Sequence, residues 1–393
     1  MLFNDYQDTS LGPLPKGWNL RTLNSVVEKT EKRDPRKTPD ELFRYIDVSS
    51  VSNKAYRVIG WKDIVGRDAP SRARKVVRSK DTIFATVRPY LKNIARIPEY
   101  LDDEICSTGY CVIRANQQML DPDYLYFVAL SDAFVESIVS QQRGSSYPAV
   151  SDKVVLDTPI PLPPLPEQRA ISHVLNTVRQ AIEATERVIT ATLELKRSMM
   201  KHLFTYGPVP IDQADQVPLK ETEVGDMPKG WKVVEVGELG EIVTGTTPRT
   251  SNREYYDGQY MFISPGDISE EVYVTKTNKF LSGKGMEVSR VLPRETVLVV
   301  CIGATIGKTA LTSADQSATN QQINAIITHD GVLPHYLYYA LTYRAHYLPN
   351  LAGRAAIPIV NKSNFAKFPV YLPTHSEQEI ISNILSSVDC VFR

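Results

Sequence analysis

The feature that most constrains the fold of this chain is a series of motifs that occurs twice. Two segments carry nearly the same signal, LPPLPEQRAISHVLNTV at Leu162–Val178 and LPTHSEQEIISNILSSV at Leu372–Val388. Three further landmarks recur in the same order at offsets of 210 to 213 residues: PKGW at Pro15 and Pro228, YLY at Tyr124 and Tyr336, and YPAVS at Tyr147 with IPIVN at Ile357. Four matches in register indicate two copies of a module of about 210 residues, which is far too long for a solenoid repeat.

Each copy is expected to be a mixed α/β globule that ends in a separate helix. Runs rich in Val, Ile, Phe, Tyr and Thr, such as FRYIDVSSV in the first copy and ETVLVVCIG in the second, are typical of strands. The stretches DPDYLYFVALSDAFVESIV and LPHYLYYALTYRAHYL are typical of amphipathic helices. A chain of 393 residues is long enough for two or three such units.

The segment from Glu167 to about Tyr206 is predicted to form one long helix. Its apolar residues recur every seven positions, with a second set three residues later, as in a helix of a coiled coil or bundle. About 40 residues at about 1.5 Å each would span about 60 Å. Pro166 suits the first turn, and Gly207-Pro208 suits the end. The alternative is one long core helix inside a larger domain, and a repeat on each side argues against it.

The second copy of this helix is expected to be shorter. The chain stops at Arg393, about 17 residues after Glu377, and Ser376 with Glu379 has the spacing of a capping box. By its rise per residue this helix covers roughly 25 Å of its partner, so another subunit or a second copy is expected to cover the remaining apolar stripe. The predicted interface residues are Ile171, Leu175, Val178, Ile182, Ile189, Met199 and Leu203.

Composition argues against several classes of protein. The chain has 45 basic and 45 acidic residues, so nucleic-acid binding would have to come from local clustering of charge. Its four cysteines form no CxxC pair and no Cys/His set, which argues against a zinc site and fits a reducing compartment. They are expected to be ordinary buried or half-buried thiols. The start lacks a signal peptide and no apolar run is long enough for a membrane span, so a cytoplasmic protein is expected.

The most enzyme-like string is GATIGKT at Gly303–Thr309. A P-loop has four residues between its first Gly and the Gly-Lys pair, but here there are three, and the following ALTSADQ is typical of strand and turn. A hairpin turn is therefore predicted, with Lys308 free to contact a phosphate. No metalloprotease motif, dinucleotide loop, nucleophile elbow or methyltransferase motif is present, so no catalytic residue, metal site or cofactor is expected. A nucleotide-dependent enzyme remains the third alternative.

In their order, these motifs resemble the specificity subunit of type I restriction-modification systems. The strings VRPYLKNIAR, GTTPRTSNREYYDG, VCIGATIGKTAL and ATNQQINAI agree with this resemblance, which covers nearly the whole chain. It implies an α/β (mixed α+β) fold with two pseudo-repeated target-recognition domains separated by long antiparallel, coiled-coil-like conserved helices. The expected boundaries are 1–163 for the first recognition domain, 164–206 for the central helix, 207–226 for a linker, 227–374 for the second recognition domain and 375–393 for a truncated distal helix.

The resemblance also implies a function. Each recognition domain would read one half of a bipartite, asymmetric DNA site, and the chain itself would not be catalytic. The implied partners are double-stranded DNA, two methyltransferase subunits and a restriction/translocase subunit, with self-association through the uncovered helix and no membrane. The alternative is a helical scaffold that does not bind DNA, or an inactive remnant of such a subunit.

A basic segment in the first module is the main local signal for DNA binding. Between Lys54 and Arg96 there are twelve basic and three acidic residues, and the alternative is a solvated surface. The loop QQRGSSYPAVS, Gln141–Ser151, resembles a DNA-facing loop of the family, with an ordinary loop after a helix as the alternative. The candidate contacts in this module are Arg72, Arg74, Lys75 and Arg78 for the backbone, Arg88, Tyr90 and Asn93 for base edges, and Lys92, Arg143, Ser145 and Ser146.

The second module is less charged and is expected to read its half-site through more polar contacts. A Pro-containing loop and the ATNQQ string supply donors and acceptors, of which the Asn and Gln side chains suit adenine edges. The candidates are Thr246, Thr247, Arg249, Asn252, Arg253, Lys308, Asn320, Gln321, Gln322 and Arg354.

Overall fold

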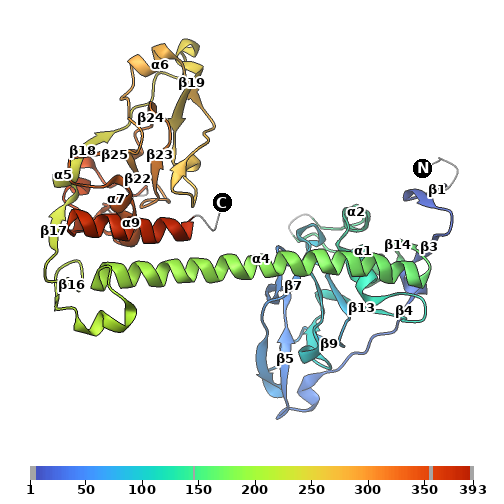
Figure 1. Ribbon diagram of the computed structural model, residues 1–393. Coiled ribbons are helices and arrows are strands. Elements are labelled where there is room, and N and C mark those ends of the chain that lie inside the picture. The colour runs from blue at the N-terminus through green and yellow to red at the C-terminus, as the bar shows by residue number, and fades with distance from the viewer. Residues whose placement is uncertain (1–5, 145–146, 354–356, 390–393) are drawn as a thin grey trace. The chain divides into compact units, whose positions relative to one another are not determined.

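The two copies of the module form two units, and one long helix, α4 (Leu165–Tyr206), contributes to both. The computed structural model describes residues 6–144, 147–353 and 357–389 (Figure 1). The division between the two units falls between Ala184 and Thr185, inside α4. None of the described helices is both long enough and apolar enough to cross a membrane.

The first unit is built on a six-stranded sheet and a four-stranded sheet. Their strand orders are β4-β13-β10-β11-β7-β6 and β8-β5-β12-β9, beside a β1-β2 hairpin and a β14-β3 pair. The strands are β1 (Tyr6–Thr9), β2 (Gly12–Pro15), β3 (Asn19–Thr22), β4 (Val27–Glu28), β5 (Leu42–Ile46), β6 (Val51–Ser52), β7 (Arg57–Val58), β8 (Lys62–Val65), β9 (Ala73–Val76), β10 (Thr82–Ala85), β11 (Ile94–Arg96), β12 (Ile105–Ser107), β13 (Tyr110–Ala115) and β14 (Pro159–Leu162). The helices besides α4 are α1 (Pro122–Leu130), α2 (Asp132–Val139) and α3 (Asp152–Asp157).

The six-stranded sheet of the first unit is buried on both faces. Successive side chains of a strand point to opposite faces, so the neighbours Ile83 and Phe84 of β10 enter different cores. Phe84 packs with Leu125 of α1 and with Phe134 of α2, whose ring meets it edge-on at 5.8 Å between centroids. Ile83 packs in the second core, on the side away from these helices. Burial on both faces explains why the strands read as continuous apolar runs.

The second unit repeats this design with a five-stranded sheet, β18-β25-β22-β23-β20, and a three-stranded sheet, β21-β19-β24. The strands are β15 (Leu219–Lys220), β16 (Met227–Pro228), β17 (Lys232–Glu235), β18 (Gly240–Thr244), β19 (Tyr256–Ile263), β20 (Tyr273–Val274), β21 (Phe280–Leu281), β22 (Val297–Val300), β23 (Thr309–Thr312), β24 (Ser317–Thr319), β25 (Ile323–Thr328) and β26 (Pro369–Leu372). The helices are α5 (Val236–Leu239), α6 (Gly283–Glu287), α7 (Pro334–Arg344), α8 (Lys362–Ala366) and α9 (His375–Asp389). The mixed α/β fold predicted for each module is confirmed.

Repeated hydrogen bonds show that the two modules match residue by residue. In the first unit, the indole N–H of Trp18 donates to the Glu167 carboxylate at 3.1 Å. In the second unit, the indole N–H of Trp231 donates to the Glu377 carboxylate, also at 3.1 Å. The repeated PKGW and Glu-Gln motifs are therefore the two ends of one contact, which ties the start of each module to the helix at its end.

The glutamines of the two Glu-Gln motifs are buried and play the same part in each unit. The side-chain oxygen of Gln168 accepts a hydrogen bond from the backbone N–H of Asp121 at 2.9 Å, just before α1. The side-chain oxygen of Gln378 accepts one from the backbone N–H of Leu333 at 2.9 Å, just before α7. Each glutamine thus fixes the first turn of a core helix against the long helix or its counterpart.

Helix α4 forms one continuous segment of 42 residues, as the seven-residue pattern predicts. It ends where expected, because Gly207 takes a positive φ of 81° and its N–H donates to the Leu203 carbonyl at 3.0 Å. Its counterpart α9 begins earlier than the capping box expected at Ser376. Thr374 is the capping residue instead, with its backbone N–H donating to the Glu377 carboxylate at 3.0 Å.

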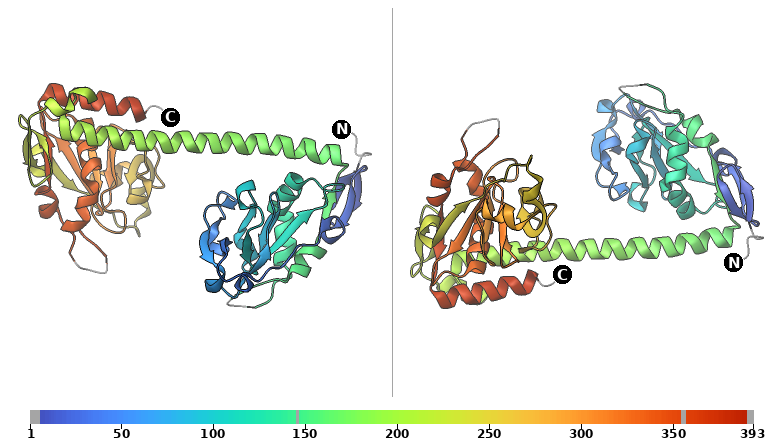
Figure 2. Two further views of the ribbon diagram at one scale, coloured as in Figure 1. Left: turned by 90° about the horizontal axis from the view of Figure 1, so that it is seen from below. Right: turned by 90° about the horizontal axis from the view of Figure 1, so that it is seen from above.

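Within the second unit, α9 lies alongside the last turns of α4 (Figure 2). The two helices are antiparallel, since Lys196 pairs with Asp389 at 2.5 Å while Phe204, further along α4, shares a core with Ile381. This arrangement of the two helices agrees with the expected packing of antiparallel helices.

Three of the four cysteines, Cys106, Cys111 and Cys301, are buried free thiols, as predicted. Burial raises the pKa of Cys301 to about 11. Cys390 lies outside the described residues.

Candidate nucleic-acid interface

The basic segment RARKVVR does not present all its charges to solvent. Lys75 lies on β9, is 6% exposed, and donates to the Tyr110 carbonyl at 2.6 Å and to the Asp152 carboxylate at 2.5 Å. The prediction that Lys75 contacts a DNA phosphate is therefore wrong, because both its partners lie inside the unit. Ala73, Lys75 and Val76 of this strand are all buried, and Arg74 is half-buried.

Of the other basic residues of this segment, some bind groups within the unit and one is exposed. The Arg78 guanidinium pairs with Asp103 at 2.8 Å and with Glu31 at 3.3 Å. Arg74 is half-buried and donates to a carbonyl of its own strand. Arg72 is exposed. The local excess of positive charge is thus partly compensated by acidic residues from other segments, and Arg72 is the member best placed to meet a phosphate.

Two loops of the first unit lie against each other and bring several candidates together. The backbone N–H of Arg88 donates to the Pro148 carbonyl at 2.8 Å, and Arg143 and Ala149 exchange two backbone hydrogen bonds. The Arg88 guanidinium lies 5.2 Å from the ring centre of Tyr147, which is 73% exposed. We call residues 86–93, 141–144 and 147–151 the paired loops of the first unit.

The paired loops hold a half-buried cation, Arg88, and an exposed aromatic ring, Tyr147, side by side. This combination suits a nucleic-acid surface, because guanidinium groups bind phosphates and base edges, and aromatic rings pack on bases and sugars. Tyr147 was not among the DNA-contact residues predicted from the sequence, although its place in the repeated YPAVS motif could have pointed to it. Tyr90 is exposed in the loop that carries Arg88, whereas Lys92 of that loop is tied to Asp132 in an ion pair. Ser145 and Ser146 lie outside the described residues.

The second unit contains the same pair of loops with different side chains. The backbone N–H of Gly303 donates to the Pro358 carbonyl at 3.0 Å, and Ile302 and Ile359 form an isolated bridge. The repeated backbone bonds make Gly303 the counterpart of Arg88. Residues 301–308 and 357–361 are therefore the paired loops of the second unit, and Arg354 lies outside the described residues.

The string GATIGKT forms the first of these loops, between the antiparallel strands β22 and β23. Gly303 and Gly307 take positive φ angles of 101° and 95°, as predicted for a hairpin turn, and a strand follows the loop where a P-loop has a helix. The Lys308 ammonium donates to the Ile268 carbonyl at 3.0 Å and is half-buried. Lys308 therefore has an internal partner, in contrast to the free lysine that was predicted.

A second group of predicted residues in this unit is brought together by β18 and β25. The Thr247 hydroxyl donates to the Gln321 side chain at 2.6 Å, and both residues are exposed. The Asn320 amide donates to Gln322 at 2.9 Å. Paired amide and hydroxyl side chains of this kind can present donors and acceptors to base edges. Asn252 differs, since its side chain accepts the backbone N–H of Glu254 and caps a short 3₁₀ turn.

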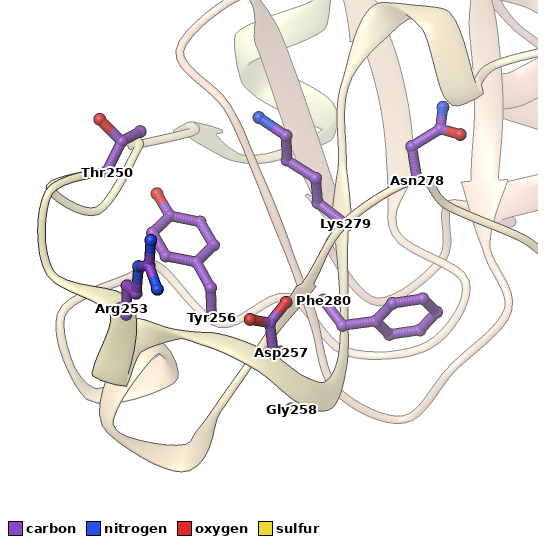
Figure 3. A pocket seen from close by; sticks show the side chains of 8 residues that line it. All are labelled: Thr250, Arg253, Tyr256, Asp257, Gly258, Asn278, Lys279 and Phe280. Carbon is purple, nitrogen blue, oxygen red and sulfur yellow. The ribbon is translucent and has the colours of Figure 1, made fainter.

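An open pocket of about 460 Å³ lies next to the Pro-containing loop (Figure 3). Figure 3 shows Arg253 and Lys279 on opposite sides of it, with the Tyr256 ring between. The Tyr256 hydroxyl donates to the Pro248 carbonyl at 2.7 Å, which fixes the loop that carries Arg249. Lys279 lies far from this loop in sequence, and no local sequence pattern pointed to it.

The apolar stripe of α4 is exposed over most of its length. Leu175, Val178, Ile182 and Ile189 are 40%, 55%, 54% and 43% exposed. Leu203, which was predicted to contact another subunit, is 4% exposed and lies in the core of the second unit. That prediction is wrong because the second module folds over the end of α4. Ile171 and Met199 are half-buried at the two ends of the stripe.

Comparison with known proteins identifies the class to which this fold and these loops belong. The family model of the type I restriction modification DNA specificity domain matches residues 15–195 and 228–391, one segment in each module. The chain belongs to this family and is a DNA specificity subunit of the type I restriction-modification class.

Individual relatives agree over nearly the full length. The chain is 24% identical to the type I restriction enzyme HindI specificity subunit of Haemophilus influenzae, over 95% of this chain and 93% of that protein. It is similar, at 32% identity and a TM-score of 0.53, to a chain from a structure concerning complex assembly and conformational transition of the type I R-M system, over 96% and 91% of the two chains. The S subunit of Mycoplasma genitalium, at 13% identity and a TM-score of 0.62 over 95% and 90%, shows the same fold.

Proposed function

We propose that the paired loops of the two units each read one half of a bipartite DNA site, and that the two halves differ in sequence. The observation that supports this is the match of the two loop pairs in backbone and their mismatch in side chains. Arg88 and Tyr147 in the first unit correspond to Gly303 and Ile357 in the second. An arginine beside an aromatic ring and a glycine beside an aliphatic chain cannot present the same groups to a base pair.

In this proposal the chain supplies recognition and position, and other subunits supply the chemistry. Two methyltransferase subunits and a restriction subunit would be its protein partners, and adenine methylation would take place in the pocket of the partner after base flipping. We expect no cofactor and no catalytic residue in this chain. A scaffold without DNA binding is not favoured, because the DNA specificity family matches a segment of both modules.

The experiment is the methylome of a host that lacks other methyltransferases and expresses this chain with its methyltransferase partner. Methylated adenines in a two-part motif with unlike halves are expected. A motif with identical halves would contradict the separate roles of the two units, and no modification with both subunits present would contradict the function.

Variants assign each half of the motif to one unit. Arg88→Ala should relax or abolish the reading of one half only, and Gln321→Ala should affect the other half only. Lys54→Ala, at an exposed position outside the paired loops, is the matched control and should leave the motif unchanged. If Arg88→Ala and Gln321→Ala alter the same half, the assignment of one half to each unit is wrong.

A further inference from the structure

The loop that carries Arg88 turns through two residues in left-handed backbone. Arg88 takes φ 50° and ψ 57°, and Lys92, four residues later, takes φ 51° and ψ 42°. Between them, Pro89–Leu91 form a 3₁₀ turn. Left-handed backbone is unfavourable for residues with long side chains, and glycine is the residue that adopts it without strain. The first unit therefore keeps a strained turn in one of its paired loops.

The second unit builds the same turn from glycine. In each unit, the carbonyl of the residue after the turn accepts a hydrogen bond from the last backbone N–H of the strand before it, at 3.1 Å in the first unit and 2.9 Å in the second. This register makes Gly303 and Gly307, at φ 101° and 95°, the counterparts of Arg88 and Lys92. The backbone of the turn thus requires no side chain at either position, and glycine would form it without strain.

An ion pair joins the second strained residue to a helix of the same unit. The Lys92 ammonium binds the carboxylate of Asp132, the first residue of α2. The side chain of Lys92 is 25% exposed and that of Asp132 is 82% exposed. An ion pair with so exposed a partner adds little to stability, so stability alone does not explain why a strained lysine stands where glycine would serve. Strain that stability does not explain points to a role in function.

In the second unit the turn is fixed at the same place by a backbone contact. A Cβ added to Gly307 would lie 2.8 Å from the Ala345 carbonyl oxygen, closer than real Cβ atoms come, so a side chain does not fit there unless the backbone shifts. The repeat makes Ala345 the counterpart of Ala133, the residue after Asp132. Both units thus hold the turn against the start of the same helical segment, the second through glycine and the first through the side chain of Lys92.

We propose that the ion pair between Lys92 and Asp132 is a latch that fixes the turn, and that Lys92 is a positioning residue for Arg88. With the latch closed, the Arg88 guanidinium keeps its place beside the Tyr147 ring, 5.2 Å from its centre, before DNA binds. A guanidinium held in one place discriminates between base pairs, whereas a mobile one can follow an acceptor on the wrong base. This inference rests on the proposed function of the paired loops, and it adds a residue that acts on specificity through Arg88.

The first measurement is hydrogen exchange in the full chain. Asp132→Asn leaves the sequence of the loop unchanged but removes the charge that holds Lys92, so exchange of the backbone N–H groups of residues 86–93 should become about tenfold faster. Lys80→Gly is the control for Lys92→Gly, because Lys80 is exposed, also has left-handed backbone at φ 69°, and lies outside the paired loops. Both glycine variants relieve strain, which offsets the greater freedom of glycine in the unfolded chain, so their urea midpoints should stay close to that of wild type.

The second measurement is the methylome of the same variants expressed with the methyltransferase partner. Lys92→Gly and Asp132→Asn should lower the discrimination against a wrong base about tenfold, and only in the half of the motif that Arg88→Ala alters. Lys80→Gly should keep the wild-type motif. Lys92→Arg retains the ion pair and should also keep it. A general loss of folding lowers methylation at every site and cannot relax one half alone.

Three results would overturn the latch and leave the proposed function intact. They are unchanged exchange of residues 86–93 in Asp132→Asn, full discrimination by Lys92→Gly, and a urea midpoint of Lys92→Gly far below that of Lys80→Gly, which would make Lys92 an ordinary stabilising residue. A wild-type methylome without a two-part motif would contradict the proposed function instead, and the exchange measurement would still decide whether the ion pair fixes the turn.

Discussion

Lys75→Met separates a structural lysine from a DNA contact. The substitution keeps most of the aliphatic volume but removes the donor to the buried Tyr110 carbonyl, and an unsatisfied buried acceptor costs about 1–3 kcal/mol. The side chain of Asp152 is 43% exposed, so loss of that ion pair adds only about 0–1 kcal/mol. We therefore expect the free energy of unfolding of the first unit to fall by about 2 kcal/mol.

Urea denaturation followed by circular dichroism measures this loss, as a lower midpoint with an unchanged slope. Lys54→Met, at an exposed position, is the matched control and should stay within about 0.5 kcal/mol of wild type. The slope of log affinity for DNA against log salt concentration should not change in Lys75→Met, whereas Arg72→Ala should reduce it by about 0.9. A normal midpoint combined with a reduced salt slope in Lys75→Met would refute the reasoning.

Three other predictions concern the second unit. Phe204→Ala empties a fully buried site and should cost about 3–5 kcal/mol of unfolding free energy in urea denaturation; a loss under about 1 kcal/mol would show that the site collapses. Burial raises the pKa of Cys301, so its thiol should react with a disulfide reagent only on unfolding, and rapid labelling of the native Cys390→Ser variant at this residue would contradict that. Burial opposes ionisation of Glu377, but hydrogen bonds from Thr374 and Trp231 outweigh it and lower its pKa. The stability this gives is present at neutral pH and is lost as pH falls through the lowered pKa, so Trp231→Phe should destabilise more at about pH 7 than at about pH 3 in urea denaturation; an equal loss at both values would count against the Glu377 contact.

The sequence was sufficient to predict the structural features that depend on the spacing of residues along the chain. The repeat predicted the correspondence of Trp18 with Trp231, and the seven-residue spacing of apolar residues predicted the length of α4. The string GATIGKT has one residue fewer before its Gly-Lys pair than a P-loop has, and this predicted a hairpin turn. These features depend on backbone geometry and on the period of apolar residues, which neighbouring positions in the chain determine.

Features that depend on distant segments could not be predicted. The partners of Lys75 lie 35 and 77 residues away in sequence, so nothing in RARKVVR distinguishes it from the exposed Arg72. Leu203 continues the pattern of the exposed stripe, yet it is buried because the second module packs over that turn. The Tyr147 ring was missed because its partnership with Arg88 arises only when the paired loops meet.

The two units show which parts of the module are constrained and which are free to differ. Contacts that hold the module together recur in both: indole to glutamate, and buried glutamine to the start of a core helix. The two glutamines are buried, so a change in either partner of their bonds would leave a buried polar group unsatisfied. On the paired loops, Tyr147 and Ile357 are exposed and Arg88 is half-buried, so these side chains can change at a lower cost. The same backbone can therefore carry different side chains on the paired loops of each unit, as Arg88 and Gly303 show.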